Sequence, residues 1–116
     1  MKIIFMIMLL SVNQAFAINL TSVAKTVTTA GTELPLTATS TKVTSVSVQA
    51  KCGNTGNIFI GDSGVSSTEG HLLDACQVWT YGNDNSLSIG NSLLDLNTVY
   101  IDTDSSGDGV QIIYTK

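Results

Sequence analysis

The feature that most constrains the fold of this chain is a strictly alternating segment, Thr44–Cys52 (TSVSVQAKC). One set of alternate positions is apolar or small, namely Val46, Val48, Ala50 and Cys52. The other set is polar, namely Ser45, Ser47, Gln49 and Lys51. A period of two is that of a β-strand with one face on a core and the other in water. The segment is therefore predicted to form a half-buried strand.

The chain beyond residue 17 favours strands elsewhere too. Residues 18–50 are rich in threonine and valine, whose branched side chains suit a pleated sheet. The apolar run Ile58-Phe59-Ile60 lies between two turn sequences and is expected to be a strand buried on both faces or at the centre of a sheet. Leu34–Ala38 contains Pro35, which cannot donate to a ladder, so an edge strand is expected there. Further strands are expected at Gln77–Tyr81, Leu87–Ile89, Thr98–Thr103 and Val110–Thr115.

Turn sequences such as GNTGN, YGNDN and DSSGDG separate these strands. Helical structure is expected only as single turns, near Glu69–Ala75 and Ser92–Asn97. Seven or eight short strands within residues 18–116 predict an all-β fold in one domain. The expected architecture is a single small antiparallel β-sandwich of jelly-roll or immunoglobulin-like type, with a small barrel as the alternative.

Residues 1–17 have the layout of a secretory signal peptide. Met1-Lys2 is positively charged, Ile3–Val12 is apolar apart from one serine, and Ala15-Phe16-Ala17 is a small-x-small cleavage site. The apolar run is too short to cross a bilayer comfortably. We expect cleavage after Ala17 and export from the cell. An uncleaved N-terminal anchor and a buried strand are the alternatives, and membrane contact is expected only through an uncleaved segment.

The charge of the chain argues against nucleic acid as a partner. The chain has 5 lysines, no arginine and 9 acidic residues, which gives a formal net charge of −4. Proteins that bind phosphate backbones need clustered cations. Nucleic-acid binding is therefore not expected.

Cys52 and Cys76 are the only cysteines. An even count in an exported chain predicts a disulfide between them, which would stabilise the fold by about 3 kcal/mol. The alternative is two free thiols in a reducing compartment, buried as small apolar residues. Two cysteines and the single histidine do not make a zinc site, so no metal is expected.

Gly61-Asp62-Ser63-Gly64 is similar to the serine context of chymotrypsin-like proteases and of GDS-type esterases. A nucleophilic serine needs a histidine to take its proton and a carboxylate to orient that histidine. His71 is the only histidine, and it follows Ser63, whereas the proteases have their histidine before the serine. The esterases need an Asp-x-x-His pair, but Thr68 stands three residues before His71. No catalytic residue is therefore expected, and the stretch is interpreted as a bend that ends a core strand.

Two further stretches have the composition of ligand loops. Asp102–Asp108 is similar to the start of an EF-hand calcium loop, but the twelfth position, a glutamate in that motif, is Ile113. Gly53–Gly56 lacks the Lys-Ser/Thr pair of a phosphate-binding loop. Both stretches are interpreted as hairpin turns, and no cofactor is expected.

Four aromatic residues, Trp79, Tyr81, Tyr100 and Tyr114, are candidates for a sugar-binding platform. Packing in the core or across strands is the commoner use of aromatic side chains in small sandwiches.

A series of different short motifs occurs in a fixed order along the chain. They are the Thr/Ser-rich lead-in Leu34–Ser40, the strand Val46–Lys51, the turn Gly53–Gly56, the strand Ile58–Ser63, Gly70 and Leu73, Leu96–Tyr100, Gly107–Val110, and Ile113-Tyr114. In this order and spacing the chain from about Lys25 to Lys116 resembles small β-sandwich proteins found among phage virion genes, of head-accessory or decoration type. The resemblance implies a non-enzymatic structural protein on the virion surface. Such a protein contacts other virion proteins and forms a homo-oligomer, expected to be a trimer.

Two features depart from that family. Cys76 stands where the family usually has a glycine, which favours a disulfide particular to this chain. The leader is the second departure, because virion proteins of tailed phages assemble in the host cytoplasm and rarely carry one. The alternative function is a secreted bacterial β-sandwich module for binding or adhesion, which recognises a glycan or a cell surface.

Overall fold

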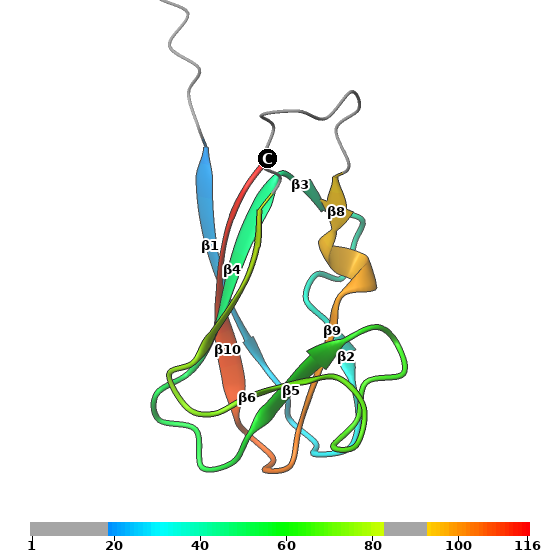
Figure 1. The fold of residues 1–116 in the computed structure, drawn as a ribbon, viewed down its shortest axis with the longest axis vertical. Coiled ribbons are helices and arrows are strands. Elements are labelled where there is room, and N and C mark those ends of the chain that lie inside the picture. The colour runs from blue at the N-terminus through cyan, green and yellow to red at the C-terminus, as the bar shows by residue number, and fades with distance from the viewer. Residues whose placement is uncertain (1–18, 83–92) are drawn as a thin grey trace, which may run out of the picture.

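The computed structural model describes residues 19–82 and 93–116, and Figure 1 shows their arrangement. The predicted leader and the strand expected at Leu87–Ile89 lie outside the described residues. The elements in chain order are β1 (Leu20–Thr26), β2 (Leu34–Pro35), β3 (Lys42–Val43), β4 (Ser45–Ala50), β5 (Ile58–Gly61), β6 (His71–Leu73), β7 (Val78–Gly82), β8 (Leu94–Asp95), the 3-10 helix η1 (Leu96–Thr98), β9 (Tyr100–Thr103) and β10 (Gly109–Thr115).

One four-stranded antiparallel sheet has the strand order β1-β10-β4-β7, and we call it sheet A. Its strands β4 and β10 alternate between buried and more exposed positions, as the sequence of β4 predicts. In the register of sheet A, Val48 of β4 lies opposite Ile112 of β10, which lies opposite Val23 of β1. The two central strands therefore present one apolar face, and the edge strands β1 and β7 flank them (Figure 1).

The second four-stranded sheet, sheet B, has the order β2-β9-β5-β6. Ile58, Phe59 and Ile60 of β5 are all buried, as expected for a strand inside a sheet with both faces covered. Pro35 lies in β2 at the edge of sheet B, where a missing N–H removes no ladder bond from the sheet's interior. The buried strand is confirmed, and the edge strand is confirmed for Leu34–Pro35 but does not extend to Ala38.

The two sheets enclose one hydrophobic core. Sheet A contributes Val46, Val48, Val110 and Ile112, and sheet B contributes Ile58, Ile60, Leu73 and Ile101. A small third sheet, β3-β8, closes one end of the molecule. The fold is thus an all-β antiparallel sandwich, as predicted, and it is not closed into a barrel. The described part of the chain has ten strands. Three of these, β2, β3 and β8, have only two residues each, too short for a sequence pattern.

Three local predictions are wrong. The segment Glu69–Ala75, expected to contain a helical turn, holds strand β6, which pairs with β5. The loops 51–57 and 104–108, expected to be hairpin turns, each connect sheet A to sheet B. Turn-forming residues specify a reversal of the chain, but the sheet that the next strand joins depends on tertiary packing. The helical turn expected near Ser92–Asn97 is matched in part by η1.

The loops at the lower end of the sandwich are joined by buried aspartates. Asp108 accepts backbone N–H groups from Thr55 and Gly56 at 3.0 and 2.7 Å. Asp102 accepts the N–H of Gly31 at 3.0 Å. Both carboxylates are buried, at 6% and 3% exposure, so each satisfies donors that water does not reach easily. Asp102 and Asp108 therefore link the segment from β9 to β10 with the loop between β1 and β2 and with the loop between β4 and β5.

Cys52 and Cys76 form a disulfide, with a Cα–Cα separation of 4.3 Å and a sequence separation of 24. It joins the end of β4 to the start of β7, the two neighbouring strands of sheet A. The predicted bridge is confirmed, although both cysteines are exposed, so Cys52 does not continue the buried side of β4. No helix in the described ranges is long and apolar enough to span a membrane.

Candidate functional site

The outward face of sheet A is the candidate site, because its composition includes no charged residue. We call it the outer face. Alternation along the paired strands assigns to it Leu20, Ser22, Ala24 and Thr26 of β1, Gly109, Gln111, Ile113 and Thr115 of β10, Ser45, Ser47 and Gln49 of β4, and Val78, Thr80 and Gly82 of β7. None of these residues is charged. The outer face is therefore neutral in a chain whose net charge is −4.

The outer face combines a shallow groove with protruding apolar side chains. A groove of about 350 Å³ runs between Ser22, Ala24, Ser47 and Gln111, whose side chains are short or flexible. Val78 and Ile113 border it and are 48% and 44% exposed. Removing water from apolar and uncharged polar groups is less unfavourable than removing it from charged groups. Covering the outer face with another protein is therefore less unfavourable than covering a charged sheet face.

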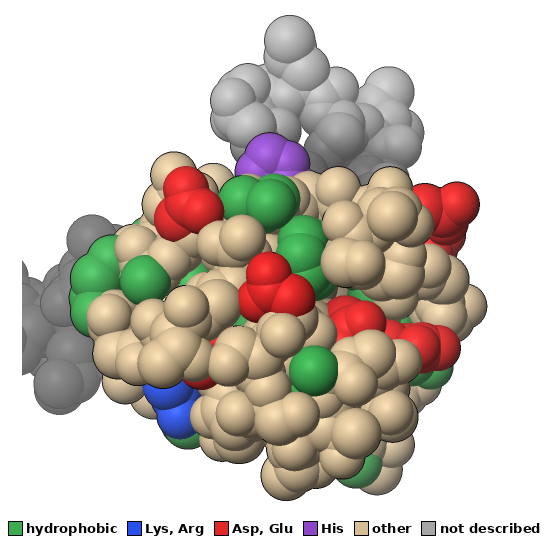
Figure 2. All heavy atoms as spheres, turned by 90° about the horizontal axis from the view of Figure 1, so that it is seen from below, with side chains coloured by type: hydrophobic (Ala, Val, Ile, Leu, Met, Phe, Trp, Pro, Cys, Tyr) green, Lys and Arg blue, Asp and Glu red, His purple; other side chains and the backbone are tan. Residues whose placement is uncertain are grey.

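The acidic residues lie elsewhere. Figure 2 views the molecule from below and shows acidic side chains spread over the loop end, with only a small basic area. Lys25 of β1 belongs to the inward face, because it is paired with the buried Val110. Lys51 lies just beyond the end of β4 and borders a second groove with Asn54 and Asp108. These charged side chains therefore lie away from the outer face.

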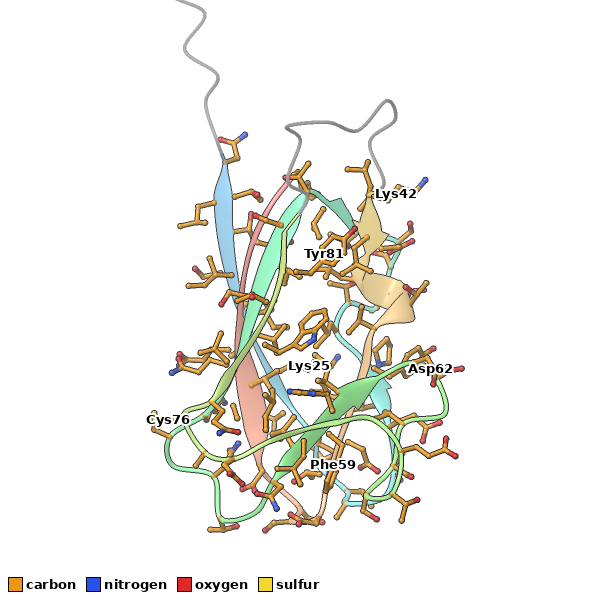
Figure 3. All side chains as sticks on the ribbon, in the orientation of Figure 1. Lys25, Lys42, Phe59, Asp62, Cys76 and Tyr81 are labelled. Atoms are coloured by element: carbon orange, nitrogen blue, oxygen red, sulfur yellow. A yellow bond between two sulfur atoms is a disulfide. The ribbon has the colours of Figure 1, made fainter. Side chains whose placement is uncertain are left out.

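The structure places Ser63 in an exposed turn after β5. Asp62 closes this turn: its carboxylate accepts the N–H of Gly64 at 2.8 Å and its carbonyl accepts the N–H of Val65 at 3.0 Å. His71 lies in β6 opposite Ile60, and no hydrogen bond within the described residues joins it to Ser63. The carboxylate beside the serine thus shapes the backbone. Figure 3 shows Asp62 and Cys76 at opposite sides of the molecule.

The four aromatic candidates do not share one surface. Trp79, Tyr81 and Tyr114 are on the inward side of sheet A, where Trp79 and Tyr81 pack against the core and Tyr114 is part of it. Figure 3 shows Tyr81 between sheet A and the segment of β8 and η1. Tyr100 is in β9 of sheet B. Trp79, Tyr81 and Tyr114 are therefore used for packing, which is the commoner role considered for such residues.

The acidic loop residues do not form a metal centre in the described ranges, where no group of three or more His, Cys, Asp or Glu side chains is placed to hold an ion. Asp104, like its neighbours, is engaged in the loops: it accepts the N–H of Asn57 at 2.7 Å.

No single stretch of the sequence identifies the outer face. Its signal was present in the alternating strand, where Ser45, Ser47 and Gln49 are the polar positions. Polar positions of this kind are usually mixed with charges on a solvated sheet face. The absence of charge becomes visible only when β1, β10, β4 and β7 are placed side by side.

The chain matches no known family model, no curated protein and no solved structure. The resemblance to phage virion proteins therefore rests on the sequence motifs alone.

Proposed function

We propose that this protein is a non-enzymatic phage virion accessory protein of decoration type, which acts through protein–protein contacts made by its outer face. The observation that carries the contact role is the lack of charge on this face, together with the exposed side chains of Val78 and Ile113. Charged residues are depleted at the centres of protein interfaces because their desolvation is unfavourable. The placement on a virion surface is supported by the sequence motifs.

The direct test is mass spectrometry of purified phage particles and of the culture supernatant from the same cells. The proposal expects peptides of this chain in the particle fraction, in a constant ratio to the capsid proteins. The same spectra report whether the N-terminal peptide begins at Ile18. A chain found only in the supernatant contradicts the virion role.

A pair of matched substitutions tests the contact surface. Ile113→Lys places a charge on the outer face, and Leu72→Lys places one on sheet B at almost the same starting exposure, 44% against 45%. Because a charge at an interface centre must be desolvated, Ile113→Lys is expected to reduce the particle-bound fraction by about tenfold or more. Leu72→Lys is expected to leave it unchanged. Equal effects of both variants would contradict binding through the outer face.

A secreted binding or adhesion module is the second candidate, favoured by the Cys52–Cys76 disulfide. Disulfides persist in oxidising compartments outside the cytosol. In this role the protein would recognise a glycan or a cell surface. Titration with a panel of glycans, followed by Trp79 fluorescence and by calorimetry, tests it, and no response in either measurement would count against this candidate.

A further inference from the structure

Strand β1 is a long sheet edge with little protection. It has seven residues, and among the strands that the structure describes only β10 pairs with it. It contains neither proline nor glycine, and its one charge, Lys25, points to the inward face. Leu20 and Val23 are 65% and 40% exposed, so two of the large apolar side chains left in water belong to this strand. Proteins usually shorten, charge or cover such an edge, because its free N–H and C=O groups can pair with another strand.

The hydrogen-bond pattern shows which groups of β1 are free to pair. In an antiparallel ladder, the residues whose N–H and C=O groups face one neighbour alternate with those that face away. Val27 donates its N–H to the carbonyl of Asp108 at 2.9 Å, which starts the ladder between the segments of β1 and β10. On the other side of β10, Lys51 donates its N–H to the carbonyl of Gly109 at 3.0 Å. Gly109 therefore faces β4, and the next residue of β10 faces β1. The main-chain groups of Leu20, Ser22, Ala24 and Thr26 therefore face the open edge.

We propose that two copies of this chain pair through β1, antiparallel about a two-fold axis at Val23, to form one continuous sheet. Val23 is the midpoint of β1, so this register pairs all seven residues of each strand. Ser22 of one copy then lies opposite Ala24 of the other, and both have main-chain groups that face the edge. Leu20 of one copy lies opposite Thr26 of the other, and the main-chain groups of both residues also face the open edge. The N–H and C=O groups of β1 that face β10 keep their hydrogen bonds to β10.

The side chains suit this register. The two copies of Val23 lie directly opposite each other in a pair without hydrogen bonds, where the Cα atoms approach to about 4.5 Å and side chains are close. Lys25 lies opposite Thr21, so the two lysines do not face each other. No acidic residue is on β1. Two copies with a net charge of −4 each can therefore approach along this edge without opposing like charges.

The other edge of sheet A is a poorer candidate. Strand β7 has five described residues, and Val78 is the one large hydrophobic residue among them that is exposed, against Leu20 and Val23 in β1. Pairing through β1 also joins the outer faces of the two copies into one surface. The pairing does not depend on the virion role, because it needs only the monomer fold.

Proline at the open edge tests the pairing with little effect on the monomer. Ala24→Pro removes an N–H that has no partner within sheet A but that would bond the second copy. Thr80→Pro is the matched control, because the N–H of Thr80 faces the open edge of β7. Ala50 donates its N–H to the carbonyl of Gln77 at 2.9 Å, so Gln77 and every second residue after it face β4. Thr80 lies between two such residues and faces away from β4. Sedimentation velocity of protein purified from cells expressing the full coding sequence gives the dissociation constant of the dimer. Two bonds are lost per dimer, so Ala24→Pro is expected to raise this constant about 30-fold or more.

Thr80→Pro is expected to leave the dimer intact. A monomeric wild-type protein at a concentration of tens of micromolar, or a dimer that dissociates with Thr80→Pro and not with Ala24→Pro, overturns the proposal. Circular dichroism checks that each variant keeps the strand signal of the wild type.

A charge exchange at Val23 tests the register and does not depend on the proline variants. Val23→Lys and Val23→Glu each place like charges opposite each other, so each variant alone is expected to be monomeric. An equimolar mixture places opposite charges together and is expected to recover a dimer. Two dimeric single variants, or a mixture that stays monomeric, overturn pairing about Val23.

Discussion

Cys76 occupies a backbone conformation that suits glycine. Its φ is 70°, and it is the third residue of a turn that Gln77 closes by donating its N–H to the carbonyl of Asp74 at 3.0 Å. A positive φ at the third residue is that of a type II turn, and a side chain disfavours it. The disulfide thus places a cysteine at a position whose backbone conformation favours glycine.

Replacing the disulfide in two ways separates these effects. Cys52→Ser/Cys76→Ser and Cys52→Ser/Cys76→Gly both remove the bridge, which is expected to lower the free energy of unfolding by about 3 kcal/mol. The glycine variant is expected to be about 1 kcal/mol more stable than the serine variant, because glycine accepts the positive φ without strain. Urea unfolding of both proteins measures the difference. Equal midpoints would contradict the assigned backbone strain.

Asp95 joins the β3-β8 end of the sandwich to η1. Its carboxylate accepts the hydroxyl of Ser40 at 2.6 Å and the N–H groups of Thr41 and Asn97 at 2.8 and 3.0 Å. The Ser40 hydrogen bond, followed by those of Thr41 and Asn97, lowers the pKa of Asp95 below its ordinary value. These bonds favour the ionised form, so the folded state binds the proton more weakly than the unfolded state.

This lowered pKa predicts an acid-dependent contribution to stability. The contribution is complete above the unfolded-state pKa of about 3.9 and is lost as the pH falls through the lower folded-state value. Asp95→Asn is therefore expected to destabilise the protein at pH 7, with a difference from wild type that shrinks in strong acid. Urea midpoints of both proteins between pH 7 and pH 2 provide the measurement. A difference that stays constant over this range would show that ionisation of Asp95 is not involved.

At the scale of elements, the pairing of β1 with β10 depends on a close backbone approach at Gly109. A Cβ at this position would lie well inside contact distance of the Lys25 carbonyl oxygen, and 3.1 Å from the Cα of Thr26. Backbone atoms cannot move aside as a flexible side chain can. The glycine thus allows the start of β10 to lie against the end of β1.

Gly109→Ala is expected to destabilise the protein by about 1–3 kcal/mol, as overpacking does in other interiors. Gly53→Ala is the control, since a Cβ there meets no heavy atom of the described structure within 4 Å. Thermal unfolding compares the two variants with wild type. An effect of Gly109→Ala no larger than that of Gly53→Ala would contradict the assigned approach of the strands.

At the scale of the whole molecule, both sheets share one core and are expected to unfold together. Leu73 of β6 is 2% exposed and packs in this core, whereas Trp79 is on sheet A. Leu73→Ala is expected to lower stability by about 2–5 kcal/mol through the cavity it leaves. The shift should be the same by Trp79 fluorescence and by far-ultraviolet circular dichroism. An unshifted fluorescence transition would show that sheet A unfolds independently.

The strands with clear local patterns were predictable from the sequence. Val46, Val48 and Ala50 alternate with polar residues, and a half-buried strand is the structure that buries only one of the two sets. Ile58–Ile60 is apolar throughout, which matches a strand covered on both faces. Neighbouring residues decide these features, because the periodicity of side chains along a strand is a property of the local backbone.

The partner of each strand was decided by tertiary structure. Loops 51–57 and 104–108 read as hairpin turns, yet each crosses between the sheets, held by contacts such as Asp108 to Gly56 that span 52 residues. The neutral outer face and the open edge of β1 follow from the same long-range pairing. A local pattern specifies which side chains are buried, but many strand orders satisfy that pattern. Only the packing of both sheets on one core selects among them.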